Sequence, residues 1–479
     1  MRVKYMIFFG VFWSNPIGGA SQTSPQKKAP NILLIMADDQ GWFDVGFNGN
    51  TKVKTPHTDH LASQGVVLNR FYSASAVCSP TRASVMTGRN PCRIGVPNAN
   101  AGHLDLNEIT LAEVLKKKGY KTGHFGKWHL GTFSKTELDA NRGGRPGEII
   151  HFTVPADHGY DVYFSTESKV PTYNPLEKPV QFGQGESLRN GWAAKERKEE
   201  TQVYGTYYWK TGLLKETGAL KGDDSKLIMD HAIDFIQQSK ENYHPFFSTI
   251  WFHTPHLPIV TNQFYRNQYP GLGFYEQNYY GAITALDEQL GRLWKYLESI
   301  GEADNTLIFY CSDNGPETET PGSAGNFRGR KRALYEGGVR VPAFVIWKNK
   351  LKGGTSTDVP LVTSDYFPTI LDLLNIDMPG DRTYDGRSAW KLIEQKEVRR
   401  NKPIGFIFNN SQSWVTDDYK LITVNNGKTY ELFNLKDDPF EKNNIIDRNL
   451  QTARKMKTQL EAWLRKIKAE RKEIERSWE

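Results

Sequence analysis

The segment Asn31-Ile32-Leu33-Leu34-Ile35-Met36-Ala37, followed directly by Asp38-Asp39, carries the pattern that decides the fold. After Asn31 every residue of the run is apolar, and no polar side chain alternates with the others. Such a run is typical of a strand buried on both faces, as in a parallel sheet covered by helices. The two aspartates then stand at the carboxyl end of this predicted strand.

The same pattern occurs three more times along the chain. Apolar runs over 122–125, 246–252 and 306–312 each end in polar residues, which are Gly126-Lys127-Trp128-His129, His253-Thr254-Pro255-His256 and Asp313-Asn314-Gly315. Each run is short enough for a single strand. We therefore predict four buried strands with a polar end each.

Helical patterns separate these predicted strands. Thr110 is expected to cap a helix that ends near Gly119, Asp224 to cap a second helix, and the apolar residues from 283 to 297 form a third helical stripe. Helices between buried strands indicate an α/β fold with a large doubly wound, mostly parallel sheet flanked by helices. Because ligands bind at the carboxyl ends of such strands, the four polar segments are expected to meet there.

Two regions depart from this pattern. Residues from about 139 to 220 are polar, rich in glycine and proline, and aromatic, which predicts insertion loops over the sheet edge. After residue 400 short strands follow, with Asn426-Gly427 as a hairpin signal between the last two, and then an amphipathic helix. We expect a large α/β domain over 30–400 and a small C-terminal subdomain over 401–479, made of an antiparallel sheet plus helix.

The N-terminus has the form of a secretory signal. Arg2 and Lys4 precede an apolar run over 5–13 and the small residues Gly18-Gly19-Ala20, which predicts a signal peptide over 1–20 and an exported, periplasmic or secreted protein. No segment is long and apolar enough for stable membrane insertion. With 61 basic against 54 acidic residues and no recognition motif, nucleic acid is not an expected partner.

The acidic strand ends supply hard oxygen donors. Asp38, Asp39, Asp313 and Asn314 offer the ligand type that Ca²⁺ requires, and Mg²⁺ has the same preference. Either pair alone would more often be a helix cap or a solvated turn. Two pairs predicted at one sheet edge favour a metal site.

Cys78 begins the segment Cys78-Ser79-Pro80-Thr81-Arg82, and small or apolar residues follow it. Proline in a first turn predicts a helix that begins here, so that Cys78 would lie at a helix N-terminus, where an anion is favoured. A buried inert cysteine is the commoner fate of this residue type, and a reactive thiolate is a further alternative. Three cysteines are too few for a disulfide scaffold, and pairing of Cys92 with Cys311 stays open.

The Cys-x-Pro-x-Arg run, followed by Thr87-Gly88-Arg89, resembles the signature of the formylglycine-dependent (type I) sulfatases of the alkaline-phosphatase-like superfamily. The segments around His256 and from Lys331 to Gly338 also resemble this family, and the likeness extends over about 30–345 and again over 430–439. It implies a sulfuric ester hydrolase in which Cys78 is oxidised to formylglycine. The partner that this requires is a formylglycine-generating enzyme or an anaerobic sulfatase-maturing enzyme.

The resemblance also implies residue roles. One divalent cation, usually Ca²⁺, would be bound by Asp38, Asp39, modified Cys78, Asp313 and Asn314. Arg82 would fix the formylglycine, and Lys127 would stabilise charge on the transferring sulfuryl group. Asp313 would act as base, and His256 and Lys331 would neutralise the leaving oxygen. His129 would take the proton from the second hydroxyl as sulfate leaves.

The expected substrate is an extracellular sulfated carbohydrate, for example a fragment of an algal polysaccharide such as carrageenan or ulvan. The export signal, the mild positive charge and the aromatic residues between 139 and 220 favour it over a small aryl or steroid sulfate. Glu167 and Lys169 are expected to contact sugar hydroxyls or a second sulfate. The alternatives are a phosphatase or phosphonate hydrolase of the same superfamily, a non-catalytic glycan-binding relative, and a chain whose Cys78 stays unmodified.

Overall fold

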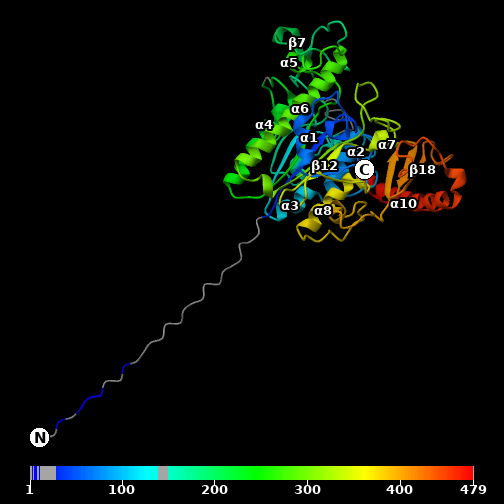
Figure 1. The fold of residues 1–479 in the computed structure, drawn as a ribbon. Helices are drawn as coiled ribbons and strands as arrows, with labels where there is room; N and C mark the ends of the chain where they lie inside the picture. The colour runs from blue at the N-terminus through cyan, green and yellow to red at the C-terminus, as the bar shows by residue number, and fades with distance from the viewer. Residues whose placement is uncertain are drawn as a thin grey trace.

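A ten-stranded sheet runs through the large part of the molecule (Figure 1), with strand order β13-β2-β12-β11-β1-β10-β4-β5-β8-β9. The computed structural model describes residues 29–138, 149–218 and 220–477, together with 3, 5–7 and 10. Most of the predicted signal peptide and the first ten residues of the predicted insertion therefore lie outside the described residues.

The five central strands are parallel, and they include all four runs predicted to be buried strands. The central strands are β11 (Thr306–Ser312), β1 (Asn31–Ala37), β10 (Phe246–Trp251), β4 (Lys121–Lys127) and β5 (Val162–Thr166). The outer strands are β13 (Thr355–Thr357), β2 (Val66–Leu68), β12 (Ala343–Ile346), β8 (Tyr208–Lys210) and β9 (Leu214–Lys215). In the register, Ile32 of β1 stands between Phe247 of β10 and Leu307 of β11. The predicted mostly parallel sheet is confirmed.

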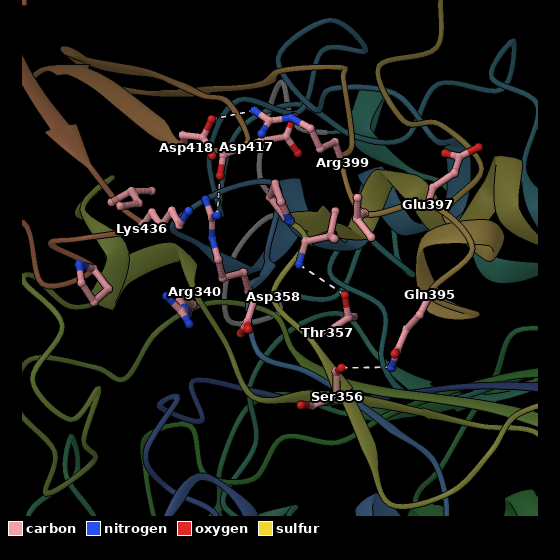
Figure 2. A pocket seen from close by; sticks show the side chains of 16 residues that line it. Arg340, Ser356, Thr357, Asp358, Gln395, Glu397, Arg399, Asp417, Asp418 and Lys436 are labelled. Carbon is pink, nitrogen blue, oxygen red and sulfur yellow. Dashed lines mark hydrogen bonds and ion pairs between the residues drawn. The ribbon is translucent and has the colours of Figure 1, made fainter.

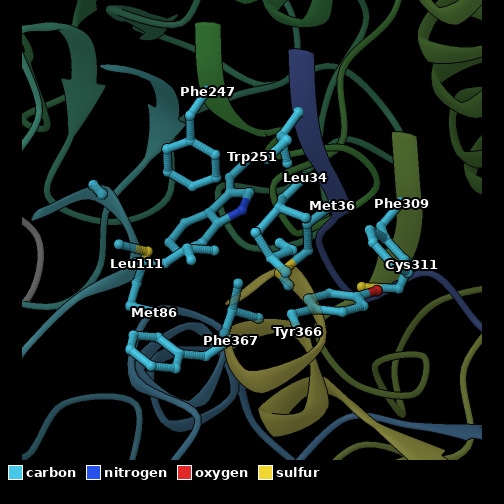
Figure 3. Close-up of a cluster of buried hydrophobic side chains, with 14 of the residues drawn as sticks. Leu34, Met36, Met86, Leu111, Phe247, Trp251, Phe309, Cys311, Tyr366 and Phe367 are labelled. Atoms are coloured by element: carbon cyan, nitrogen blue, oxygen red, sulfur yellow. The ribbon is translucent and has the colours of Figure 1, made fainter. Parts of the chain in front are cut away.

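Helices cover both faces of this sheet, because alternate residues of each buried strand face opposite sides. Leu33 and Ile35 of β1 belong to a hydrophobic cluster with residues of α4 (Asp224–Glu241) and α6 (Phe274–Ser299). Leu34 and Met36 belong to a second cluster, in which Figure 3 shows them close to Trp251 and to Tyr366 and Phe367 of α8 (Tyr366–Leu373). Residues of α2 (Cys78–Thr87) and α3 (Leu111–Lys117) complete this second cluster. The sheet is thus wound on both sides.

The shorter elements lie around this core. They are the helices α1 (Pro56–Ser63), α5 (Gln263–Arg266), α7 (Glu336–Val339) and α9 (Trp390–Ile393), and the strand pairs β3 (Phe71–Tyr72) with β14 (Leu361–Val362) and β6 (Glu177–Pro179) with β7 (Thr201–Val203). The pair β6–β7 belongs to the predicted insertion. Among the described residues, no helix is both long and apolar enough to cross a membrane.

The predicted helix caps are right in one case and wrong by one residue in another. Thr110 caps α3 with a full capping box, in which Glu113 N donates to Thr110 and Glu113 accepts from Thr110 N. The cap of α4 is Asp223 rather than Asp224. Asp224 is bonded instead to Tyr208 Oη at 2.6 Å and to His253 Nδ1 at 2.7 Å, so its carboxylate is unavailable for capping.

After residue 400 the chain forms the predicted antiparallel sheet and helix, seen beside the large sheet in Figure 1. The sheet consists of β15 (Ile404–Phe408), β16 (Ser411–Val415), β17 (Tyr419–Thr423) and β18 (Glu431–Asn434), and the helix is α10 (Leu450–Ser477). One face of the sheet packs on the large domain through Phe406, and the other on α10 through Trp414. Both faces of the small sheet are therefore covered.

The turn at Asn426-Gly427 is longer than a two-residue hairpin. Both residues have positive φ, as predicted for a tight turn, but β18 begins only at Glu431. Gly427 N donates to Thr423 Oγ1, and Thr429 N donates to Asn425 Oδ1, so local side-chain acceptors take donors that the strand ladder would need. The predicted strand over 428–432 therefore starts later than expected.

All three cysteines are free and buried, which answers the question of Cys92 and Cys311. Cys311 lies in the hydrophobic cluster of Figure 3, next to Tyr366. Cys92 lies beside β15, with Sγ 3.9 Å from the carbonyl oxygen of Ile407. The two thiols thus serve as core residues of different regions.

Candidate active site

The carboxyl ends of β1, β4 and β11 bring their polar residues to one edge of the sheet, as the fold predicts. The backbone joins these ends directly, since Asp313 N donates to Ala37 O and Asp38 N donates to Thr254 O, both at 3.1 Å. Asp39 has a φ of 65° and His129 a φ of 55°. Left-handed backbone is uncommon for residues other than glycine, although aspartate and histidine adopt it more often than most, and it gathers at functional sites.

Each of three buried carboxylates at this edge meets a buried cation. Lys127 Nζ lies 2.6 Å from Asp38 Oδ2, and Lys331 Nζ lies 2.7 Å from each carboxylate oxygen of Asp39. The third pair joins Arg82 of α2 to Asp313, with Nη2 at 2.6 Å and Nε at 3.1 Å from the same oxygen. The formal charges of the three pairs cancel, which is how so many ionised groups can share a dry site.

Burial dominates the proton affinities in this cluster. It raises the pKa of Asp39 and of Asp313, and the negative charge of Asp38 raises that of Asp313 further. Burial alone would lower the pKa of Lys331, but the charge of Asp39, its hydrogen bond and the neighbouring charge of Asp38 act together against burial, and the pKa is raised. Lys331 therefore stays protonated as a fixed positive charge.

Cys78 is the first residue of α2 and is 1% exposed. The helix has no side-chain cap at Val77, so its first N–H groups and its dipole favour an anion at Cys78. Burial raises the pKa of the Cys78 thiol well above its usual range, so an unmodified Cys78 is a thiol and not a thiolate at neutral pH. The shift disfavours the reactive-thiolate alternative.

The residues predicted to bind a metal fit a cation by their donor atoms. Ligand atoms of three predicted ligands, Asp38, Asp39 and Cys78, lie within 4.8 Å of one another in a group that also includes His256, which was not predicted as a ligand. Asp38 Oδ1 and Asn314 Oδ1 are buried and have no hydrogen-bond partner among the described residues. Other buried oxygens of this structure also lack partners, but these two lie beside a carboxylate cluster, where an oxygen-ligated cation would satisfy them. A possible metal-binding cluster thus stands at this sheet edge.

A cavity of about 520 Å³ opens above Cys78. Its walls combine cations (Lys127, Lys169, Arg189, Lys331 and Arg332), side-chain amides (Asn98, Asn100 and Asn409), His129, His256, Glu317 and the apolar Val77, Leu257 and Phe408. Phe408 is the last residue of β15 and Asn409 follows it in the turn to β16, so the C-terminal sheet supplies part of the wall. The volume lies within the usual range of small-molecule sites.

The two histidines predicted at the site line this cavity, and His253 does not. His256 Nδ1 lies 2.6 Å from Leu257 O, and its Nε2 lies 3.6 Å from Asp39 Oδ2. Burial and the charges of Lys331 and Lys127 lower the pKa of His256 well below its usual range. His253 is fully buried and bonded to Asp224 and Thr166, which is a structural role.

Of the two residues predicted to contact the sugar, Glu167 and Lys169, only Lys169 lines the cavity. Glu167 is 0% exposed and does not line it, and its backbone carbonyl oxygen accepts a hydrogen bond from His129 N. Sequence reasoning missed Glu317, which is bonded to Arg332 at 2.6 and 2.8 Å and lies 3.7 Å from Lys331. Its place three residues after Asn314 was the available signal. Arg330, the other neighbour of Lys331, donates to the carbonyl oxygens of Glu317, Thr320 and Gly322 instead.

A second, larger cavity of about 670 Å³ lies between the large domain and the C-terminal sheet (Figure 2). Its charged residues are mostly occupied with each other or with backbone, since Arg399 is bonded to Asp418 at 2.6 Å and Arg70 Nη1 to Asp417 O at 2.6 Å. No residue of the Cys78 cluster lines it. It is therefore not the candidate active site.

Comparison with known proteins agrees with this site. The sulfatase family model matches residues 30–376, and the model of the N-sulphoglucosamine sulphohydrolase C-terminal region matches residues 322–470. The chain therefore belongs to the sulfatase family. With the cluster around Cys78, this makes it a sulfuric ester hydrolase.

Relatives with assigned activities are similar over most of the chain. Human N-acetylgalactosamine-6-sulfatase is 31% identical over 81% of this chain and 69% of its own length. Rat steryl-sulfatase is 30% identical over 76% of this chain and 70% of its own length. Among solved structures, Ps i-CgsB has a TM-score of 0.76 and 26% identity, covering 91% of this chain and 92% of its own, and it has also been solved in complex with k-i-k-neocarrahexaose.

Proposed function

We propose that this sulfatase hydrolyses sulfate esters of a sulfated carbohydrate, using formylglycine made from Cys78 and one divalent cation. The observation that carries the proposal is the position of Cys78, at an uncapped helix N-terminus beneath a cation-lined cavity and beside three paired carboxylates. The hydrated aldehyde supplies two hydroxyls on one carbon, one to attack sulfur and one whose deprotonation later expels sulfate.

Asp38, Asp39, Asp313, Asn314 and modified Cys78 would hold the cation, which we propose is Ca²⁺. The orphaned oxygens of Asp38 and Asn314 support this set, and oxygen donors suit Ca²⁺ better than a transition metal. A bound divalent cation would polarise a sulfuryl oxygen and turn the charge-balanced cluster net positive, as an anionic ester requires.

The chain's own residues have separable tasks. Arg82, held between Asp313 and the carbonyl oxygen of Lys127, fixes the charge beneath residue 78. Lys127 and the α2 N-terminus face the sulfuryl oxygens. Asp313 accepts the proton of the attacking hydroxyl, and Lys331 and His256 neutralise the charge on the leaving oxygen. His129 accepts the proton of the second hydroxyl as sulfate leaves.

Sulfated carbohydrate is favoured over a small aryl or steroid sulfate by the wall of the cavity. Asn98, Asn100 and Asn409 carry amides that can both donate to and accept from hydroxyls. Relatives named as an N-acetylgalactosamine-6-sulfatase and a structure holding a neocarrahexaose add support, although the steryl-sulfatase relative shows that the family also takes other esters. Export, inferred from residues 1–20, agrees with a polysaccharide fragment as substrate.

The test is release of inorganic sulfate from carrageenan, ulvan, fucoidan and glycosaminoglycan oligosaccharides by wild type and Cys78→Ala. We expect sulfate from at least one oligosaccharide with wild type and none with the variant. Equal release by the variant overturns the mechanism, and release from aryl sulfates alone overturns the carbohydrate assignment. The mass of the tryptic peptide that contains residue 78 reports the modification, because an aldehyde in place of the thiol lowers it.

The rival functions make different predictions. A phosphatase or phosphonate hydrolase would release phosphate or cleave phosphonate monoesters faster than it releases sulfate. A non-catalytic glycan-binding protein would bind oligosaccharides without turnover.

A further inference from the structure

The cavity above Cys78 carries more positive than negative side chains. Among the described residues that line it, five are lysine or arginine, and Glu317 is the one carboxylate. Four of the five cations have a carboxylate partner within 4 Å, in the pairs Lys127–Asp38, Lys331–Asp39, Arg189–Glu319 and Arg332–Glu317. The remaining cation is Lys169.

Lys169 has no hydrogen bond and no ion pair with any of the described residues. Its side chain is partly buried, and the positive charges of Lys127, Lys331 and Arg189 repel its own positive charge. Burial and these neighbours therefore lower the pKa of Lys169. A partly buried ammonium without a counter-charge is unfavourable, because burial removes the water that would otherwise solvate it. The position is thus prepared for an anion that the chain itself does not supply.

The sulfate that would be hydrolysed already has enough cations. Lys127 and Lys331 are bonded to the carboxylates around Cys78, and Arg82 and the α2 N-terminus lie beneath it. Lys169 is outside this bonded network and enters the wall from the segment after β5. Its charge is therefore available to another group of the same substrate.

We propose that Lys169 binds a second anionic group of the substrate, a sulfate or a carboxylate on the same sugar or on its neighbour. The preferred substrate is then a saccharide with at least two negative groups, of which one is hydrolysed at residue 78. This inference rests on the proposed function, and it adds a specificity residue to it.

The test uses the oligosaccharide that wild type hydrolyses, together with its form from which one neighbouring sulfate has been removed or one carboxylate reduced. The ratio of kcat/KM for the two forms measures the preference for the second charge. Lys169→Gln is expected to reduce this ratio by about 10- to 100-fold, the range of a charge-assisted hydrogen bond. Lys169→Arg keeps the charge and should retain most of the preference.

Arg197→Gln is the matched control, because Arg197 is an exposed cation of the same insertion and does not line the cavity. Its ratio should equal that of wild type. The inference is overturned if wild type has no preference for the more highly charged form, or if Lys169→Gln loses the same factor on both forms, which would assign Lys169 to the hydrolysed sulfate. If wild type releases no sulfate from any saccharide, the proposed function itself fails.

Discussion

At the scale of single residues, the site depends on paired charges. Asp38, Asp39 and Asp313 each hold a cation at hydrogen-bond distance in a fully buried setting. Removing one member of such a pair leaves the other as an uncompensated buried charge, which is more damaging than losing the contact alone. Conservative substitutions at these positions are therefore expected to have large effects.

Asp38→Asn tests the metal site directly. Wild type should gain thermal stability with Ca²⁺, by about 2.7 kcal/mol at a concentration 100 times Kd, whereas Asp38→Asn should respond far less because a carboxylate ligand is lost. Differential scanning fluorimetry with and without Ca²⁺ measures this. Asp381→Asn, which changes an exposed carboxylate, should respond like wild type. A full response by Asp38→Asn would remove Asp38 from the ligand set.

Glu317→Gln tests the residue that the sequence did not single out. The Glu317 carboxylate is buried, yet the hydrogen bonds from Arg332 and the charge of Lys331 hold its pKa at about 2. A neutral amide would release Arg332 and leave Lys331 less firmly placed. We expect kcat/KM for sulfate release to fall about 10-fold or more. Glu298→Gln, in a surface pair with Lys348, should stay at wild-type activity, and an active Glu317→Gln enzyme would contradict the assigned role.

At the scale of elements, β17 is joined to α7 by a buried cation. Lys420 of β17 is 0% exposed, with Nζ at 3.0 Å from Glu336 of α7 and 2.9 Å from Glu441. The charges of Glu441 and Glu336 raise the pKa of Lys420 against the effect of burial. Because α7 follows Lys331 closely, this contact links the small sheet to the candidate active site.

Lys420→Met should destabilise the protein by about 3–5 kcal/mol, since it removes the buried cation that Glu336 and Glu441 share and leaves Glu336 only the longer pair with Arg340 at 3.5 Å. Thermal or urea denaturation measures the change. Adding Glu441→Gln should recover part of it, because one of the two charges is then gone. Lys428→Met, at an exposed position of the turn before β18, should change stability by less than about 0.5 kcal/mol.

The sequence alone predicted the central strands, but it did not predict the cap of α4 or the wall of the cavity. The central strands were predictable because a short, mostly apolar run such as 306–312 is typical of a strand buried on both faces. The polar residues after these strands then lie together, because the carboxyl ends of parallel strands meet at one edge of the sheet. The cap of α4 was not predictable, because Asp223 and Asp224 fit equally well until Tyr208 and His253 bind one of them. The cavity wall was missed too. Asn98 and Asn409 carry no local pattern, and only the packing of the C-terminal sheet brings them together, with a side-chain contact of 3.4 Å.

At the scale of the whole molecule, the C-terminal sheet packs against the large domain and shares a hydrophobic cluster with it. Its apolar face, including Phe406 and Ile422, forms one cluster with Tyr72 and with Val77, the residue before Cys78. A chain that stops at residue 400 would expose this cluster to water. Large exposed apolar patches lead to association.

We therefore expect a chain of residues 1–400 to be aggregated and inactive, as judged by size-exclusion chromatography and sulfate release. Supplying residues 401–479 as a separate chain should restore neither property fully, because folding would then need an encounter between two unstable parts. A soluble, active 1–400 chain would show that the large domain is independent.

Part of the cavity wall comes from the C-terminal end of the chain, so it is synthesised after the rest of the site. Cys78 leaves the ribosome long before Phe408 and Asn409, which form part of the wall of its cavity. Until the region beyond residue 400 is made, this part of the wall is missing and the segment around Cys78 is more open to another protein than in the folded protein, where Cys78 is 1% exposed. The proposed oxidation of Cys78 would then be easiest in this interval, whose length is set by translation speed. Slower synthesis of the region beyond residue 400 should raise the fraction of active enzyme without changing any contact in the folded protein.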